Sequence, residues 1–409
     1  MRAWRVHEYG QPTEVLRLDE VEIPEPGPGE VRVKAQAIPL NLNDLERITG
    51  GNMMVRPEFP YSPGMEAFGI VDACGEGAEE WMGKRVAAVT KQAFGGFAGR
   101  AARMRTPWKR LKIRPCIRCN QTCQVRDARN PIVTCVVEPT SGHESTDPNW
   151  YTQVASKKVA VVGAGPAGLE AAYTAARRGH LVEVYEKQNA AGGVAAFAGP
   201  GGTFVHWLYE QCVALGVRFH FGVSVDETTN LGADVVLQCT GSRPGVPTYT
   251  LPDHSAAFDV VDVMNGSCAL PESGDILLHD PIGGPIAIAL AQWLGQRAIL
   301  ITPDNIAGNE LSRSGDLAPA NVRLAQHGTR VVKRALVRGV TKSAQGVCIE
   351  VQDRYSGETT TYEAAAFIDC GFRLPTEHIA PQFHLAGDSV APRTILEAVL
   401  EARRAVFML

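Results

Sequence analysis

The stretch that most constrains the fold of this chain is residues 157–187, KKVAVVGAGPAGLEAAYTAARRGHLVEVYEK. An apolar run at 159–162 leads into a glycine-rich turn, an alanine-rich segment follows, and a second apolar run at 181–185 ends at Glu186. This order predicts a strand, a turn, a helix and a second strand. It is the context in which a glycine fingerprint indicates a dinucleotide-binding unit.

Each glycine of the fingerprint has its own expected role. Gly163 lets the chain turn tightly off the strand, Gly165 lets backbone amides approach a pyrophosphate, and Gly168 lets the helix lie close to the strand. The N-terminus of the helix supplies N–H groups and partial positive charge to phosphates. Glu186, 23 residues after Gly163, is placed to accept hydrogen bonds from a ribose. An empty Rossmann-like unit is the alternative. The residues expected to bind the dinucleotide are Gly163, Gly165, Pro166, Ala167, Gly168, Glu186 and Lys187.

Length, charge and cysteine use narrow the class of protein. A chain of 409 residues is expected to form two or three domains. A net charge of −4 argues against a protein that mainly binds nucleic acid. We find no apolar run of membrane length and no signal peptide, so we expect a cytoplasmic protein without a membrane partner. Four of the ten cysteines lie between Cys116 and Cys135, which favours a reduced compartment with one metal site over a disulfide framework.

Residues 1–100 read as a β-rich unit. Residues 31–35 alternate between apolar and polar side chains after a turn rich in proline and glycine, and residues 69–71 and 85–89 predict further strands. The segments PEPGPGEVRVKAQAIPLNLNDLERITG, YSPGMEAFGIVDACG and GKRVAAV make this part similar to the GroES-like catalytic domain of the medium-chain dehydrogenase/reductase superfamily, in particular the zinc-independent quinone oxidoreductases. The resemblance implies a barrel with Asn41 and Asp44 facing an active cleft.

This N-terminal resemblance is incomplete. Zinc-dependent members carry a cysteine near the position of Asn41 and a histidine where this chain has Met65, so we expect no catalytic zinc here. The nucleotide-binding domain of that superfamily does not follow, because the similarity stops after Ala98. We therefore interpret this part as an appended domain used for packing or partner contact. A quinone or enone reductase that uses the N-terminal cleft is the alternative.

The second strong signal is a cysteine quartet. Cys116, Cys119 and Cys123 lie within eight residues, and Cys135 follows after eleven more. Three closely spaced thiolates can bind three corners of an iron–sulfur cube and a distant fourth can close it, whereas structural zinc more often uses two CxxC pairs. Free thiols remain the third reading. Residues 103–118 carry seven lysines and arginines without an acid. They are interpreted as a solvated linker, or as cations that offset the charge of a cluster, rather than as a nucleic-acid patch.

The segments RPCIRCNQTC and TCVVEPTSGHE resemble the iron–sulfur segment of the old yellow enzyme-like flavoproteins that include 2,4-dienoyl-CoA reductase and trimethylamine dehydrogenase. The similarity covers about residues 111–409. It implies a [4Fe–4S] cluster on the four cysteines and FAD on the fingerprint at Gly163. It further implies that the carboxyl group of Asp388 bonds the ribityl chain, and that a helix at 392–405 points its N-terminus at the flavin. The further FAD contacts implied are Gly192, Gly193, Thr240, Gly241, Gly387 and Asp388.

An inserted unit is expected between these motifs. Residues 275–279 predict a strand, 286–294 a helix and 298–301 a second strand, which is a βαβ unit in the place of a nicotinamide nucleotide domain. Only Gly283 and Gly284 stand for the glycine motif, and the second strand ends without an acid. NADPH or NADH, a structural nucleotide and no ligand at all therefore stay open. The histidines, His279 among them, are spread singly and are interpreted as satisfied or solvated side chains.

The resulting hypothesis is an α/β oxidoreductase with a GroES-like barrel, an iron–sulfur segment and two Rossmann-like units, the NAD(P) domain being inserted in the FAD domain. Electrons would pass from NAD(P)H through FAD to the cluster and on to a separate acceptor. Family members carry an FMN-bearing barrel of about 250 residues before the cluster, and 115 residues precede Cys116 here, which suggests a fusion or a rearranged gene. A non-catalytic flavin-binding remnant is a further alternative. The expected domains are 1–100, 101–150, 151–250, 251–365 and 366–409.

Overall fold

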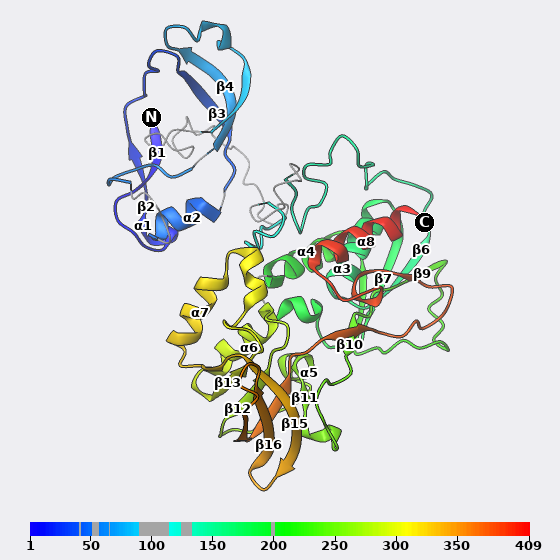
Figure 1. The fold of residues 1–409 in the computed structure, drawn as a ribbon. Helices are drawn as coiled ribbons and strands as arrows, with labels where there is room; N and C mark the ends of the chain where they lie inside the picture. Colours follow the sequence, from blue (N-terminus) through cyan, green and yellow to red (C-terminus); the bar gives the residue numbers. More distant parts are fainter. Residues whose placement is uncertain (41, 51–56, 65, 90–113, 124–132, 198–200) are drawn as a thin grey trace. The chain divides into compact units, whose positions relative to one another are not determined.

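The computed structural model describes residues 1–409 apart from 41, 51–56, 65, 90–113, 124–132 and 198–200 (Figure 1). The chain divides into two compact units, Met1–Lys109 and Arg110–Leu409. The division falls nine residues after the boundary that the sequence predicts at residue 100. Each unit is built around cores of its own.

The first unit is β-rich, as the sequence predicts. Its described strands form two antiparallel sheets, and its small core joins Val6, Val15, Ile48 and Tyr61. Among the described residues these sheets do not close into a barrel. One sheet pairs β1 (Arg2–Val6) with β2 (Leu16–Glu20), the other has the order β3 (Val31–Ala37), β4 (Glu66–Cys74), β5 (Arg85–Val89), and the helices are α1 (Pro12–Val15) and α2 (Leu42–Thr49).

The second unit contains a five-stranded parallel sheet around the glycine fingerprint. Its central strand is a nearly continuous buried apolar run, as parallel strands covered on both faces require. The strand order is β20 (His384–Leu385), β9 (Val235–Gln238), β6 (Lys158–Val162), β7 (Leu181–Glu186) and β8 (Arg218–Phe221). The helices of this layer are α3 (Pro166–Arg177), α4 (Gly202–Ala214) and α8 (Ile395–Phe407).

Small side chains decide how these helices pack. Most of α3 is buried, and its alanines let α8 lie close alongside it (Figure 1). The larger side chains of Leu169, Phe204 and Leu208 fill the space between the helices and are fully buried. The core therefore lies directly behind the glycine turn and holds its strand and helix in place.

A second parallel sheet follows in the chain and has its own core. Three further strands form an antiparallel sheet beside it. The parallel order is β11 (Phe258–Asp259), β18 (Ala366–Asp369), β12 (Ile276–His279), β13 (Ala298–Ile301), β14 (Arg330–Val332), with α5 (Val260–Met264), α6 (Pro285–Leu294) and α7 (Leu317–Gln326). The antiparallel order is β15 (Ala335–Ser343), β16 (Gly346–Asp353), β17 (Thr359–Ala364).

The chain leaves the first parallel sheet and later returns to it. A short antiparallel ribbon carries both crossings, because β10 (Ser242–Pro244) pairs with β19 (Arg373–Pro375). After the ribbon the chain adds β20 to the edge of the first sheet and ends in α8, next to α3 (Figure 1). The C-terminal motif is thereby brought back to the fingerprint, 220 residues earlier in the chain.

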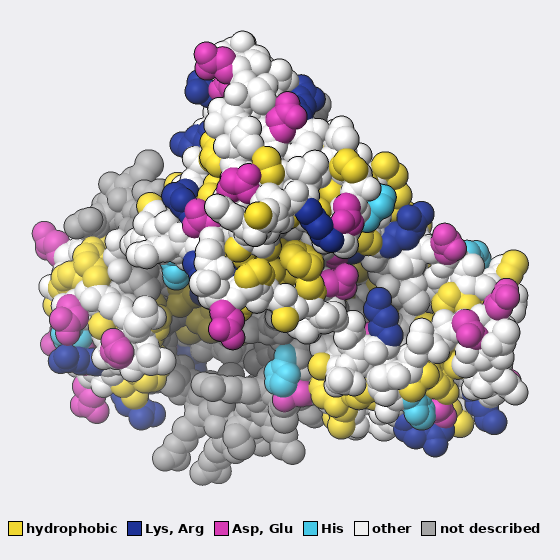
Figure 2. Space-filling model, turned by 90° about the horizontal axis from the view of Figure 1, so that it is seen from below, with side chains coloured by type: hydrophobic (Ala, Val, Ile, Leu, Met, Phe, Trp, Pro, Cys, Tyr) yellow, Lys and Arg dark blue, Asp and Glu magenta, His cyan; other side chains and the backbone are white. Residues whose placement is uncertain are grey.

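The helix that the sequence predicts at 392–405 begins three residues later. Thr394 and Glu397 form a capping box there, in which each side chain accepts a backbone N–H at the start of α8. Across the described residues we find no helix that is both long and apolar enough to cross a membrane. Figure 2 shows acidic and basic side chains interspersed over one face, without a field of a single sign.

Candidate functional site

The first glycine turn has the shape that its sequence predicts. Gly163 has a φ of +103°, and a Cβ placed on it would lie 2.3 Å from the carbonyl oxygen of Cys239. A Cβ on Gly168 would lie 1.8 Å from the carbonyl oxygen of Gly163. Both positions therefore require glycine for the strand and helix to approach each other.

The second predicted glycine pair lies against this turn. The amide of Gly192 donates to the carbonyl oxygen of Ala164 at 2.8 Å, and a Cβ on Gly193 would lie 3.1 Å from the Cα of Gly165. Among the described residues no side chain caps the N-terminus of α3, which begins at Pro166. An uncapped N-terminus behind a glycine turn is an arrangement that favours binding of a phosphate.

Glu186 ends the neighbouring strand and is anchored to the turn. Its carboxylate accepts the amide of Ala164 at 2.7 Å and that of Gln188 at 2.8 Å. Each carboxylate oxygen has a second lone pair, so a ribose hydroxyl can still donate to it. Lys187, the next residue, is exposed.

The C-terminal motif packs on the fingerprint. Gly387 has a φ of +72°, and a Cβ on it would lie 2.6 Å from the Cβ of Ala167, in the first turn of α3. Asp388 follows half-buried, and its burial raises the pKa of its carboxyl group, although the amide of Arg393 donates to it at 3.3 Å. The backbone of Gly387, the residue before Asp388, therefore lies close to the start of α3.

Thr240 and Gly241 complete the group. The hydroxyl of Thr240 lies 2.6 Å from that of Thr376, and the amide of Gly241 donates to Ser389 at 3.2 Å. All these motifs gather at the carboxyl end of the strands, where β7 and β8 extend the sheet on one side of β6 and β9 extends it on the other. Such a switch point is where open α/β sheets bind their ligands.

The cysteine segment is attached to the same unit. Ile117, Val136 and Val137 are buried in the core that also contains α3 and α8. Within the segment, the amide of Arg118 donates to the Sγ of Cys116 at 3.3 Å. The hydroxyl of Thr122 donates to the carbonyl oxygen of Thr134 at 3.1 Å, which ties the residues preceding Cys123 and Cys135 together.

The four thiols form one electrostatic group. Burial raises the pKa of Cys119, and the charges of Cys123, Cys135 and Cys116 act in the same direction. Soft thiolates in this number are the donor set of an iron–sulfur cluster. The described residues contain no group of three or more His, Cys, Asp or Glu side chains arranged to hold a metal ion directly. The cluster therefore stays a prediction, which the number and chemistry of the four thiols support.

The second glycine turn differs from the first. The carboxylate of Asp280 accepts the amide of Gly283 at 2.8 Å and that of Ile282 at 3.3 Å, so a side chain already occupies amides that would meet a phosphate. Burial raises the pKa of Asp280 to about 6. Gly284 caps α6, and the neighbouring strand β13 leads into a buried Thr302 without an acid.

A small cavity opens at the carboxyl end of β12 and β18. His279 lines it, together with Tyr249 and Asp369. The hydroxyl of Tyr249 donates to Asp369 at 2.8 Å, and Nδ1 of His279 lies 3.2 Å from the other carboxylate oxygen. Burial alone would raise the pKa of Asp369, but the hydrogen bonds from His279 and Tyr249 lower it. This contact agrees with the interpretation of His279 as a satisfied side chain. Its partners Tyr249 and Asp369 are 30 and 90 residues away in the chain, and no local sequence pattern marks them.

Some predicted residues fall elsewhere. Asn41 lies outside the described residues, and Asp44, on α2, is buried. Most of the basic run at 103–118 also lies outside them. Arg114 does not fit the prediction of a solvated linker, because its guanidinium is buried and paired with Glu170. Sequence patterns miss this pair because the two residues are 56 positions apart.

Comparisons with known proteins agree with the division of the chain into two units. Residues 27–109 match the model of the alcohol dehydrogenase GroES-like domain, and residues 161–222 match that of an NAD(P)-binding Rossmann-like domain. The chain is 34% identical over 202 residues to an NADH oxidase of Thermoanaerobacter brockii, which is 47% of this chain and 31% of that protein. It is 43% identical over 77 residues to an alcohol dehydrogenase of Moraxella sp. strain TAE123, which is 19% of this chain and 22% of that protein.

A solved structure shares the fold of most of the chain. Histamine dehydrogenase from Rhizobium sp. 4-9 matches 73% of this chain and 48% of its own, with a TM-score of 0.63 and 22% identity. The two resemblances expected from the sequence are thus confirmed, one for each end of the chain. The chain spans about a third of the length of the NADH oxidase that it matches.

Proposed function

We propose that the chain is a FAD- and [4Fe–4S]-dependent oxidoreductase that takes electrons from NADH or NADPH and passes them to a separate acceptor. The observation that carries the proposal is the gathering of four sequence motifs at one switch point, on a unit whose core also holds the cysteine segment. When bound, a flavin exchanges electron pairs with a nicotinamide and single electrons with a cluster, and the protein supplies binding and orientation.

The residues have distinct roles in this proposal. The turn at Gly163–Gly168 and the N-terminus of α3 bind the pyrophosphate, Glu186 accepts hydrogen bonds from the ribose, and Asp388 accepts one from the ribityl chain. The four cysteines bind the iron. In the proposed domain division the FAD-binding parts are 151–250 and 366–409, with an NAD(P) domain at 251–365 inserted between them. The GroES-like domain is 1–100 and the cluster segment 101–150.

The first experiment is a cofactor inventory with an absorbance spectrum of the purified protein. We expect FAD close to one per chain, with iron and labile sulfide in equal amounts. Anaerobic addition of NADH or NADPH should bleach the flavin band. A flavin band that neither nucleotide bleaches would refute electron entry from a nicotinamide, and tight stoichiometric zinc without iron would refute the cluster.

A second candidate function uses the N-terminal unit. It is favoured by the GroES-like match at 27–109 and by the similarity to an alcohol dehydrogenase. In this case the chain would be a zinc-independent quinone or enone reductase. The discriminating experiment is NADPH-dependent turnover of a quinone and an enone by the Cys116→Ser variant. Turnover that survives this substitution favours the N-terminal site, because the cysteine quartet then takes no part.

A flavin-binding protein without nicotinamide chemistry is the remaining candidate. The carboxylate of Asp280 favours it, because this group occupies the turn where a nucleotide phosphate would bind. Replacing Asp280 with alanine, which removes the acceptor from the amides of this turn, separates the cases. If nicotinamide reduces the flavin of the variant and not that of the wild type, the carboxylate blocks the site in the native chain.

A further inference from the structure

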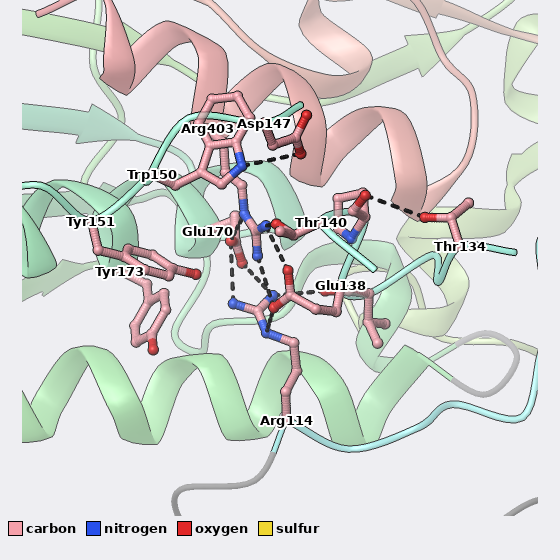
Figure 3. A network of polar contacts seen from close by, with 12 residues as sticks. Arg114, Thr134, Glu138, Thr140, Asp147, Trp150, Tyr151, Glu170, Tyr173 and Arg403 are labelled. Atoms are coloured by element: carbon pink, nitrogen blue, oxygen red, sulfur yellow. Dashed lines mark hydrogen bonds and ion pairs between the residues drawn. The ribbon is translucent and has the colours of Figure 1, made fainter. Parts of the chain in front are cut away.

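Four charged side chains, three of them buried and one partly exposed, form a network next to the cysteine segment (Figure 3). We call it the Arg–Glu network. It consists of Arg114, Glu138, Glu170 and Arg403. Arg114 donates to Glu170 at 2.8 Å through Nη1 and at 3.2 Å through Nη2. Arg403 donates to Glu170 at 2.7 Å and to both carboxylate oxygens of Glu138, at 2.7 and 3.1 Å.

The members come from both ends of the cysteine segment and from the two central helices. Arg114 stands two residues before Cys116, and Glu138 stands three residues after Cys135. Glu170 lies on α3, just after the fingerprint, and Arg403 lies on α8. The network therefore joins both ends of the loop that carries the cysteines to the helix whose N-terminus faces the proposed flavin site.

Further contacts close the base of this loop. Nη1 of Arg114 also donates to the carbonyl oxygen of Val137 at 2.8 Å, which links the two ends of the segment directly. Its guanidinium lies 5.0–5.5 Å from the ring centres of Tyr173, Phe204 and Trp207, from α3 and α4. These contacts fix the position of the guanidinium, because a planar cation gains both from rings and from paired carboxylates.

Because most of the network is buried, each charged member depends on its partners. The side chains of Glu170 and Arg403 are 0% exposed, that of Arg114 is 9% exposed and that of Glu138 is 36% exposed. Two cations and two anions balance, so the complete set carries no net charge. Removal of one member leaves an uncompensated charge in a poorly solvated place, which is far less favourable than removal of an exposed pair.

We propose that the Arg–Glu network is a clamp that positions the cysteine loop against helices α3 and α8, and that its charge balance sets the reduction potential of the cluster. The inference rests on the proposed function where it speaks of a cluster. The positioning of the loop does not depend on that function. The four residues are positioning residues, since they act on the loop that carries the ligands and not on the cluster itself.

Two variants with opposite charge effects test the clamp. Glu138→Gln removes one negative charge, and Arg114→Gln removes one positive charge from a neighbouring position in the same network. Arg338→Gln is the matched control, because Arg338 lies outside the cysteine segment and its exposed side chain donates to Gln352 at 2.9 Å. The full-length chain is used throughout, and FAD content and thermal unfolding report whether each variant is folded.

The first measurement is the rate at which a thiol reagent labels the cysteines of the iron-free chain. Both network variants should label faster at Cys119 and Cys135, which are half-buried in the wild type, while the control labels at the wild-type rate. The second measurement is retention of iron after reconstitution with iron and sulfide. By analogy with groups that orient metal ligands, we expect retention about 10-fold weaker in the network variants.

The third measurement separates positioning from general loosening. The midpoint potential of the cluster, followed by its paramagnetic signal, should rise in Glu138→Gln, because loss of a negative charge favours the reduced cluster. It should fall in Arg114→Gln for the opposite reason. A purely structural role would shift both in the same direction or shift neither.

The outcomes are distinct. Faster labelling in both network variants, with opposite potential shifts, supports the whole inference. Labelling and potentials equal to those of the wild type in folded variants would overturn it. If the wild type assembles no cluster and the network variants still label faster, the clamp holds and the proposed cluster fails. If they label no faster, the clamp fails whatever the wild type binds.

Discussion

At the scale of single residues, the glycines of the first turn differ in the space around them. A Cβ on Gly168 would overlap the carbonyl oxygen of Gly163 at 1.8 Å, whereas a Cβ on Gly165 would meet its nearest atom, the Cα of Gly193, at 4.0 Å. Gly168 is therefore needed by the fold. Gly165 is needed only if something else approaches its backbone.

This difference gives a paired prediction. Gly168→Ala should lower the free energy of unfolding by about 1–3 kcal/mol, because strand and helix must move apart. Gly165→Ala should stay within about 0.5 kcal/mol of the wild type yet lose most FAD binding, since the new methyl group faces the pyrophosphate. Urea unfolding and FAD titration measure the two effects. A Gly165→Ala variant that binds FAD like the wild type would count against the proposed site.

Asp280 gives a pH-dependent prediction. Its folded pKa of about 6 lies above its ordinary value, so its contribution to stability is fully present below about pH 4 and is lost as the pH rises through 6. Asp280→Asn mimics the protonated group. We expect it to stabilise the chain by up to about 3 kcal/mol at pH 8, since one pKa unit corresponds to about 1.4 kcal/mol.

The gain from Asp280→Asn should shrink toward zero near pH 4, where the wild-type carboxyl group is protonated as well. Urea midpoints at several pH values between 4 and 8 measure it. Asp226→Asn gives a control of opposite sign, because hydrogen bonds from Thr228 lower the pKa of Asp226. That variant should lose stability at neutral pH and not at acid pH. A gain at Asp280 that does not change with pH would contradict the assigned cause.

At the scale of helices and strands, local patterns predict much of the second unit. The apolar runs at β6, β7, β12 and β13 and the helix α6 lie where the sequence predicts them, because buried parallel strands and glycine turns leave continuous local signals. The ribbon of β10 and β19 has no such signal. Its strands are three residues long and 131 positions apart, so only the finished fold brings them together.

The start of α8 shows the limit of a resemblance. The segment at 392 is expected to be helical, but the helix begins at Ile395, where Thr394 accepts the amide of Leu396 at 3.2 Å and Glu397 accepts that of Thr394 at 3.0 Å. The capping box is written in the sequence as Thr-Ile-Leu-Glu. These residues mark the boundary in the sequence itself. The pairing of Arg403 with Glu138, 265 residues apart, has no such local sequence signal.

The cap itself is testable. Thr394→Ala should lower the free energy of unfolding by about 1 kcal/mol, because the amide of Leu396 at the start of α8 loses the hydroxyl that accepts its hydrogen bond. Thr394→Ser retains the hydroxyl and should cost much less. Urea unfolding of the two variants measures the difference. An equal loss in both would assign the effect to the methyl group of the threonine and not to the capping hydrogen bond.

At the scale of the whole molecule, the division between Lys109 and Arg110 predicts that the second unit folds and binds its cofactors without the first. The cores agree with this, since the cluster of Val6, Val15, Ile48 and Tyr61 shares no member with those of residues 110–409. A chain of residues 110–409 retains Arg114 and so keeps the Arg–Glu network. We expect it to bind FAD with the stoichiometry of the full chain and to unfold at a similar temperature.

The same truncation decides between the two candidate functions. Bleaching of the flavin by NADH or NADPH should survive removal of residues 1–109 if electrons enter through the second unit. Quinone or enone turnover that disappears with those residues, while flavin content is unchanged, would place that activity in the GroES-like unit. Because the two readouts depend on different units, loss of one alone assigns it to its part of the chain. Loss of FAD itself would refute the independence that the separate cores imply.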